Sequence, residues 1–157
     1  MVLRLAVGHR DDRADDLVAW RGPAADQQPF DFARLAAIPP DELETLVFTL
    51  HPSAQLIRSP YPLLKIWQVN QPEYQGEMTL DWNVEGDRLL IARRGFEVEI
   101  RRCEVSEYAF LQQLVEQKNL HDALAAASLT GDTFDLQGML TRLIQADVIS
   151  GWVEKRT

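Results

Sequence analysis

The chain has 157 residues, of which 46% are hydrophobic and 25% charged, with a formal net charge of -8 and a pI near 4.8. This length suits one domain with its own core, or one domain with a partly ordered extension, and argues against a second full domain. The negative charge works against polyanionic partners such as nucleic acid or acidic lipid headgroups. The single cysteine, Cys103, excludes an internal disulfide, and no apolar run approaches about 20 residues. We therefore expect a cytoplasmic protein.

The first half of the chain predicts short elements separated by breaks. Residues 1–29 carry aspartates among scattered arginines without a sustained apolar period, so we predict a poorly specified extension. Residues 30–87 predict a short helix near Phe32 and a helical turn after Pro40. Two strands around the His51-Pro52-Ser53 corner follow, then a helix beginning at Pro62 and an acidic linker.

The second half, residues 88–157, predicts two strands that meet at Arg94-Gly95 and then three helices. Residues 89–92 are an unbroken apolar run, and apolar and charged residues alternate cleanly over residues 96–101. The third helix has the strongest signal, because its apolar residues recur at helical spacing: Leu136, Met139, Leu140, Leu143 and Ile144. We expect an α+β fold, with a small antiparallel sheet or hairpins and a C-terminal winged-helix-like unit of three helices.

No constellation of residues predicts a catalytic or metal site. The histidines lie far apart and lack a second ligand at the usual spacing: His9, His51 and His121. The chain has neither a Gly-x-Ser-x-Gly elbow nor a phosphate-binding glycine loop. We interpret His51 as bonding the backbone of its own corner, and Cys103 as a structural, partly buried thiol. The expectation is a protein that is not an enzyme and needs no cofactor or metal.

Two kinds of binding fit a hairpin followed by three helices. A winged helix binds DNA through its third helix, but residues 104–148 carry seven acidic residues against Lys118 and Arg142. Alternatively, an extended peptide adds to the outer edge of the second strand, residues 96–102, with the third helix as the other wall of a groove. Arginines on that strand would select acidic peptides. The candidate peptide-binding residues are Glu97, Glu99, Arg101, Arg102, Gln137, Thr141 and Arg142.

The same strand has a third interpretation. It could already pair with one of the strands in residues 46–58, which would leave no groove for a peptide. Composition alone does not decide between a paired strand and an open edge.

A family resemblance adds to these alternatives. The segment LHPSAQLIRSPYP at residues 50–62, ending at Ile66-Trp67, resembles the "LHPS…L…S.YP…IW" segment of the HvfC/BufC-like family, whose members are often described as DNA-binding. Residues 89–93, 107–114, 122–124 and 134–143 resemble the C-terminal half of that family, so the match covers about residues 30–152. Residues 1–29 do not resemble the helical domain usually found at the N-terminus.

The resemblance implies a non-catalytic partner of a multinuclear non-haem iron oxidase. Such oxidases modify cysteines in ribosomally made peptides, often in connection with copper handling, and a leader peptide extends the sheet beside the third helix. We therefore expect a subunit that binds a precursor peptide and presents it to the oxidase. The alternative is a winged-helix DNA-binding regulator.

Overall fold

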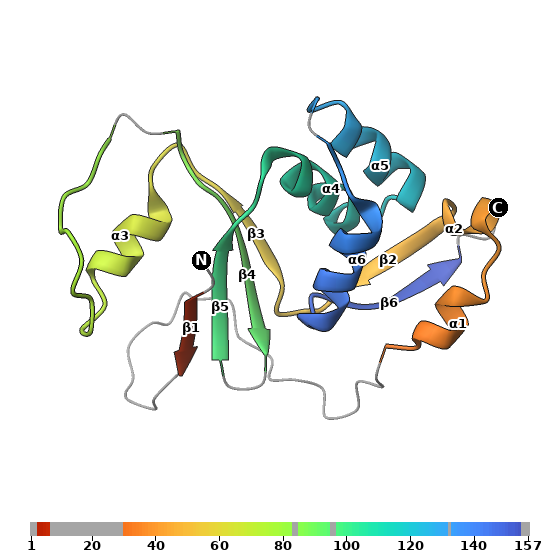
Figure 1. Ribbon diagram of the computed structural model, residues 1–157, viewed down its shortest axis with the longest axis horizontal. Coiled ribbons are helices and arrows are strands. Elements are labelled where there is room, and N and C mark those ends of the chain that lie inside the picture. Colours follow the sequence, from red (N-terminus) through yellow and green to blue (C-terminus); the bar gives the residue numbers. More distant parts are fainter. Residues whose placement is uncertain (1–2, 7–29, 83–84, 95–96, 132, 155–157) are drawn as a thin grey trace.

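The computed structural model describes residues 3–6, 30–82, 85–94, 97–131 and 133–154. In these ranges the chain is an α+β protein with six helices and two small antiparallel sheets (Figure 1). In chain order the elements are β1 (Leu3–Ala6), α1 (Phe32–Ala36), α2 (Pro40–Leu43), β2 (Leu46–Leu50), β3 (Gln55–Arg58), α3 (Leu63–Val69), β4 (Arg88–Arg94), β5 (Glu97–Arg102), α4 (Val105–Val115), α5 (Leu120–Ser128), α6 (Leu136–Gln145) and β6 (Ile149–Glu154).

The larger sheet has the strand order β1-β5-β4-β3 and is covered on both faces. Leu90 and Ala92 of β4 point to one face, where they join the apolar core with α4. Leu89 points to the opposite face and is also buried, on the side where α3 begins. Burial on both faces explains why β4 is an unbroken apolar run.

The smaller sheet pairs β2 with β6, which follows the last helix. Its register runs from Leu46 opposite Glu154 to Leu50 opposite Ile149, with an irregularity at Thr49 and Leu50. The central apolar core lies between this sheet and α4 to α6, and its largest fully buried side chains include Phe48 and Phe110. The core therefore joins segments from both halves of the chain.

Several predicted elements are confirmed, but their partners differ from the expectation. The three helices after residue 104 are present, as are the strands on either side of the His51 corner. These two strands do not form one unit, because β2 pairs with β6 and β3 pairs with β4. Within the predicted extension, Leu3–Ala6 forms β1. The rest of that extension lies outside the described residues.

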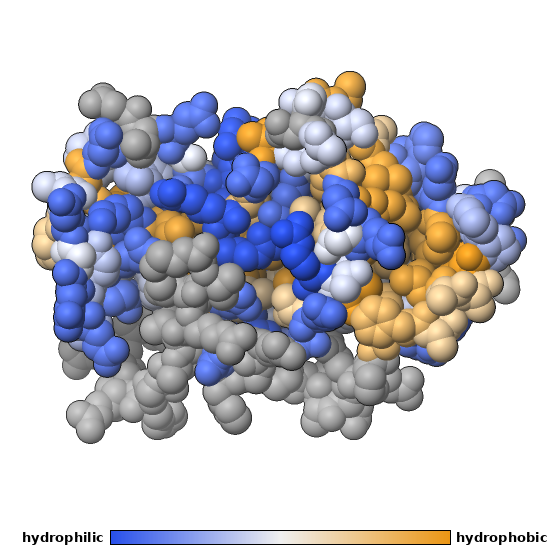
Figure 2. Space-filling view, viewed as in Figure 1, coloured by the Kyte–Doolittle hydropathy of each residue, from blue (hydrophilic) through white to orange (hydrophobic). Residues whose placement is uncertain are grey.

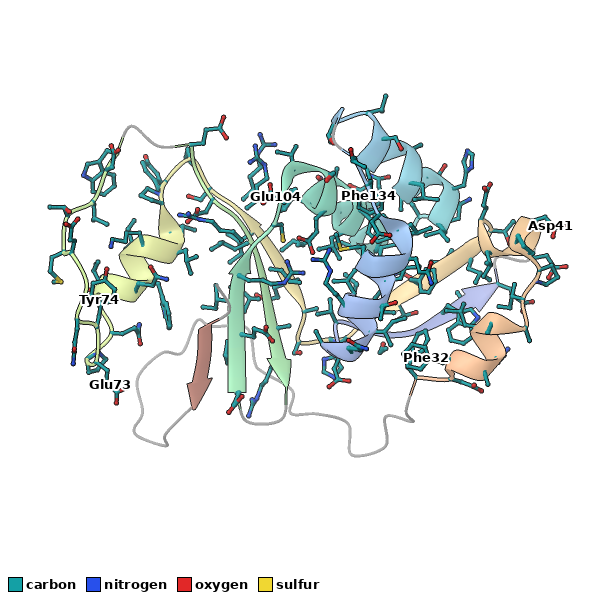
Figure 3. All side chains as sticks on the ribbon, in the orientation of Figure 1. Phe32, Asp41, Glu73, Tyr74, Glu104 and Phe134 are labelled. Atoms are coloured by element: carbon teal, nitrogen blue, oxygen red, sulfur yellow. The ribbon has the colours of Figure 1, made fainter. Side chains whose placement is uncertain are left out.

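The loop after α3 folds back onto that helix. Tyr74, labelled in Figure 3 beside α3, accepts a hydrogen bond from Lys65 Nζ and donates one to the Glu77 carbonyl oxygen at 3.1 Å.

None of the helices in the described ranges has both the length and the apolar character that crossing a bilayer requires.

Candidate functional site

The predicted peptide-binding residues fall into two separate groups. The first group lies on β5 of the larger sheet: Glu97, Glu99, Arg101 and Arg102. The second group is exposed on α6, which lies beside β6 of the smaller sheet: Gln137, Thr141 and Arg142. The expected groove with β5 and α6 as its two walls is therefore not formed. That these side chains bind a peptide stays a prediction.

The outer edge of β5 is occupied by the chain itself. β1 pairs antiparallel with β5, from Leu3 opposite Ile100 to Ala6 opposite Glu97. The expectation of a free edge is wrong over these residues, and so is the expectation that β5 pairs with a strand from residues 46–58. Pairing with β1 gives the backbone N–H and C=O groups of β5 partners inside the protein, which an open edge would leave to solvent.

Arg101 is held by a buried carboxylate of the following helix. Its Nη1 donates to Glu107 Oε2 at 2.9 Å and its Nη2 donates to Glu107 Oε1, while Glu107 is only 4% exposed. Burial alone lowers the pKa of Arg101, but the hydrogen bond and charge of Glu107 outweigh it, so the pKa is raised. This guanidinium fastens the end of β5 to the first turn of α4.

Arg102 is held by a second buried carboxylate. Its Nε donates to Asp87 Oδ1 at 2.6 Å, and the other oxygen, Asp87 Oδ2, accepts the Leu64 backbone N–H at 2.7 Å. Asp87 is 2% exposed, and it joins the start of β4, the end of β5 and the first turn of α3. Both arginines predicted to attract an acidic peptide are thus engaged with carboxylates of the protein.

Cys103 and His51 have structural roles. Burial, together with the charge of Glu107, raises the pKa of Cys103 to about 12, so the thiol is protonated at neutral pH. The Ser53 backbone N–H donates to His51 Nδ1 at 3.1 Å, and Ser53 Oγ bonds both main-chain groups of Arg93. The burial expected for Cys103 and the bond expected between His51 and the backbone of its own corner are confirmed. The residues that the structure describes contain no group of three His, Cys, Asp or Glu side chains placed to share a metal ion.

The structure adds a cleft that the sequence analysis did not identify. It lies where β3 ends and β4 begins, has a volume of about 520 Å³, and is lined by residues 58–60 and 85–88. Gly86 permits this close approach, because a Cβ at that position would overlap the Ser59 carbonyl oxygen and lie 2.5 Å from Pro60 Cα. The signal available in the sequence was the SPYP turn after β3 together with Gly86, but neither indicates a cleft until β3 and β4 are paired.

Two arginines flank this cleft. Arg58 of β3 lies directly opposite Arg88 of β4, and residues in such a pair point to the same face of a sheet. Within the described part of the chain, neither guanidinium has an ion-pair partner. Glu85 is the exposed acid of the lining, since Asp87 is buried against Arg102. Figure 2 shows hydrophilic residues gathered over this end of the larger sheet, with hydrophobic residues over α1 and the smaller sheet.

Two exposed aromatic side chains stand beside the cleft. Tyr61 follows the lining residue Pro60 and is 57% exposed, and Trp82 is 62% exposed. Their ring centroids lie 6.4 Å apart in an edge-to-face arrangement. The site therefore combines two cations with an accessible apolar surface.

Comparisons with known proteins give no relative: neither a protein-family model, nor a curated protein, nor a solved structure matches this chain.

Proposed function

We propose that this protein is a non-catalytic recognition subunit that binds a ribosomal precursor peptide and presents it to a multinuclear non-haem iron oxidase. In this proposal the β4–β5 hairpin and helices α4 to α6 act as a winged-helix-like module. The encounter with a newly made peptide would take place in the cytoplasm. The protein would contribute affinity and position, and the oxidase would supply the chemistry.

The observation that carries the proposal is the outer edge of β3. The Ser59 N–H donates to the Asp87 carbonyl oxygen at 2.9 Å. Because backbone groups alternate in direction along a strand, the N–H and C=O groups of Ile57 and Gln55 also point toward β4. The N–H and C=O groups of Leu56 and Arg58 consequently point away from β4. β3 is the edge strand of the larger sheet, at the edge nearest to α4 and α6 (Figure 1). No strand in the described ranges pairs with its outer edge. An extended peptide can form main-chain hydrogen bonds at such an edge.

The resemblance noted in the sequence supports the same location. The LHPS segment forms the corner that leads into β3, where His51 and Ser53 fix the chain against β4. The segment that carries the resemblance thus orients the edge strand. This proposal replaces the β5 edge with the β3 edge and keeps recognition by strand addition.

A pull-down with the full chain tests the function. The candidate partners are a multinuclear iron oxidase and a precursor peptide, to be sought among the neighbouring genes, each at micromolar concentration. We expect a complex of all three, and slower amide hydrogen exchange at Leu56 and Arg58 when the peptide is bound. Absence of any association would overturn the function. Association without protection in β3 would overturn the β3 edge as the docking site.

The alternative prediction, DNA binding, has weaker support. The third helix, α6, contains one cationic residue, Arg142, and a DNA-binding protein needs several cations in contact with phosphates. A gel shift at low and moderate salt discriminates between the two functions. Tight binding with a steep salt dependence would favour the DNA-binding function.

A further inference from the structure

We propose that Arg58 and Arg88 form the specificity pocket for an acidic side chain of the bound peptide. This inference rests on the proposed peptide binding and names the chemistry of the peptide. Arg58 can contact the peptide in two ways. Its backbone lies at the open edge of β3 and can hydrogen-bond the peptide main chain, and its side chain flanks the cleft and can pair with an acidic side chain.

The charges at this end of the sheet separate into two classes. Arg101 and Arg102 are each neutralised by a carboxylate that is at most 4% exposed, Glu107 and Asp87 respectively. Arg58 and Arg88 are directly opposite like charges, an arrangement that destabilises a pair of strands. A carboxylate close to this pair would relieve the repulsion, and none of the described carboxylates, the exposed Glu85 of the cleft included, lies within ion-pair distance of either guanidinium. The pair is therefore complementary to an anionic ligand.

The ligand is an extended peptide because of the register that β3 imposes. The peptide residue that pairs with Arg58 projects its side chain on the same face of the sheet as Arg58. The peptide residue that pairs with Leu56 lies two positions away and projects its side chain on that same face. Leu56 packs against the apolar core from this face. The peptide should therefore place an acidic residue opposite Arg58 and an apolar residue opposite Leu56, separated by one residue. Tyr61 and Trp82 offer apolar surface to the flanking part of the peptide.

Fluorescence anisotropy with defined peptides tests this register. The first probe is a short labelled peptide with Val and Glu separated by one Thr, and the matched probe has Gln in place of Glu. We expect the full chain to bind the Glu peptide about tenfold more tightly, which corresponds to about 1.4 kcal/mol. The preference should shrink as salt is added, because the arginines are accessible to solvent.

Variants of the protein complete the test. Arg58→Gln combined with Arg88→Gln should abolish the preference for Glu, and the single exposed change Arg58→Gln should reduce it. Lys118→Gln, at an exposed cation between α4 and α5, is the control and should leave binding unchanged. Arg142→Gln tests whether α6 carries the recognition instead. Arg58→Glu with Arg88→Glu should reverse the preference toward a Lys-containing peptide. Thermal melting of each variant establishes that it is folded.

The outcomes separate this inference from the proposed function. Binding that is equal for the Glu and Gln peptides, or unaffected by the double arginine change, overturns the pocket while peptide binding stands. A loss caused by Arg142→Gln alone assigns recognition to α6 and also overturns the pocket. No binding of either probe, together with no binding of the encoded precursor, overturns the function and the pocket together.

Discussion

Replacing Asp87 by alanine should destabilise the fold by about 2 kcal/mol. The first part of this loss is the hydrogen bond from Asp87 Oδ2 to the Leu64 N–H in the first turn of α3, because a missing helix cap costs about 1 kcal/mol. The second part is the charged hydrogen bond to Arg102. Such bonds contribute about 1.5 to 3 kcal/mol when buried, but the Arg102 side chain is 56% exposed, so we assign about 1 kcal/mol.

Urea unfolding followed by circular dichroism measures this loss. For a chain of this length the change corresponds to a melting temperature lower by about 4 to 8 °C. Asp87→Asn keeps an oxygen for Leu64 and should cost about half as much. Glu85→Ala, two residues away and exposed, is the matched control and should stay within about 0.5 kcal/mol. A double-mutant cycle with Arg102→Ala isolates the ion pair. If Asp87→Ala cost less than about 0.5 kcal/mol, the role of this carboxylate in joining three elements would be refuted.

Three further predictions concern packing and ionisation. Leu143→Ala should lower the free energy of unfolding in urea by about 2 to 5 kcal/mol, because Leu143 is fully buried. Leu140 is half-buried, so Leu140→Ala should cost less. Equal losses would contradict the assignment of the buried face of α6. Gly86→Ala should lower the melting temperature by several degrees, because the new Cβ would collide with the backbone of Ser59 and Pro60. Gly151→Ala is the control and should not lower it, because nothing lies within 4 Å of a Cβ at that position. Similar shifts for the two variants would disprove the close approach of Gly86 to Ser59 and Pro60. The pKa of Cys103 is raised to about 12 from 9.0, so the stabilising effect of its thiol is fully present below pH 9 and is lost as pH rises from 9 toward 12. The difference in unfolding free energy between the natural chain and Cys103→Ala should therefore shrink over that window. A constant difference would contradict the burial of the thiol.

Local sequence patterns predicted the elements of this fold well. The third helix was predicted from apolar residues at helical spacing, and Met139, Leu143 and Ile144 are indeed its buried residues. The charged and apolar alternation of residues 96–101 predicted a strand, and β5 is present, although Glu99 and Arg101 are as partly buried as Val98 and Ile100. Such patterns identify elements because they depend on neighbours within a few residues.

Strand partners were not predictable in this manner. The short corner at His51 suits a hairpin, yet β2 pairs with β6, where Ser150 and Thr49 are 101 residues apart in sequence. The pairing of β1 with β5 likewise joins distant segments, Leu3–Ala6 and Glu97–Arg102. Alternation specifies that a strand has a buried face, but it carries no information about which other strand supplies its hydrogen bonds. The predicted groove failed for this reason, because it required an unpaired edge at β5.

The arginines illustrate the same limit for a binding site. Arg101-Arg102 is conspicuous in the sequence, but its carboxylate partners lie 6 and 15 residues away, at Glu107 and Asp87, and meet it only in the folded chain. Arg58 and Arg88 are inconspicuous because each stands alone, and pairing of β3 with β4 brings them side by side. A cationic site is therefore defined by which positive charges the fold leaves without a carboxylate. Clustering along the chain is a poor guide to it, since adjacent residues of a strand point to opposite faces.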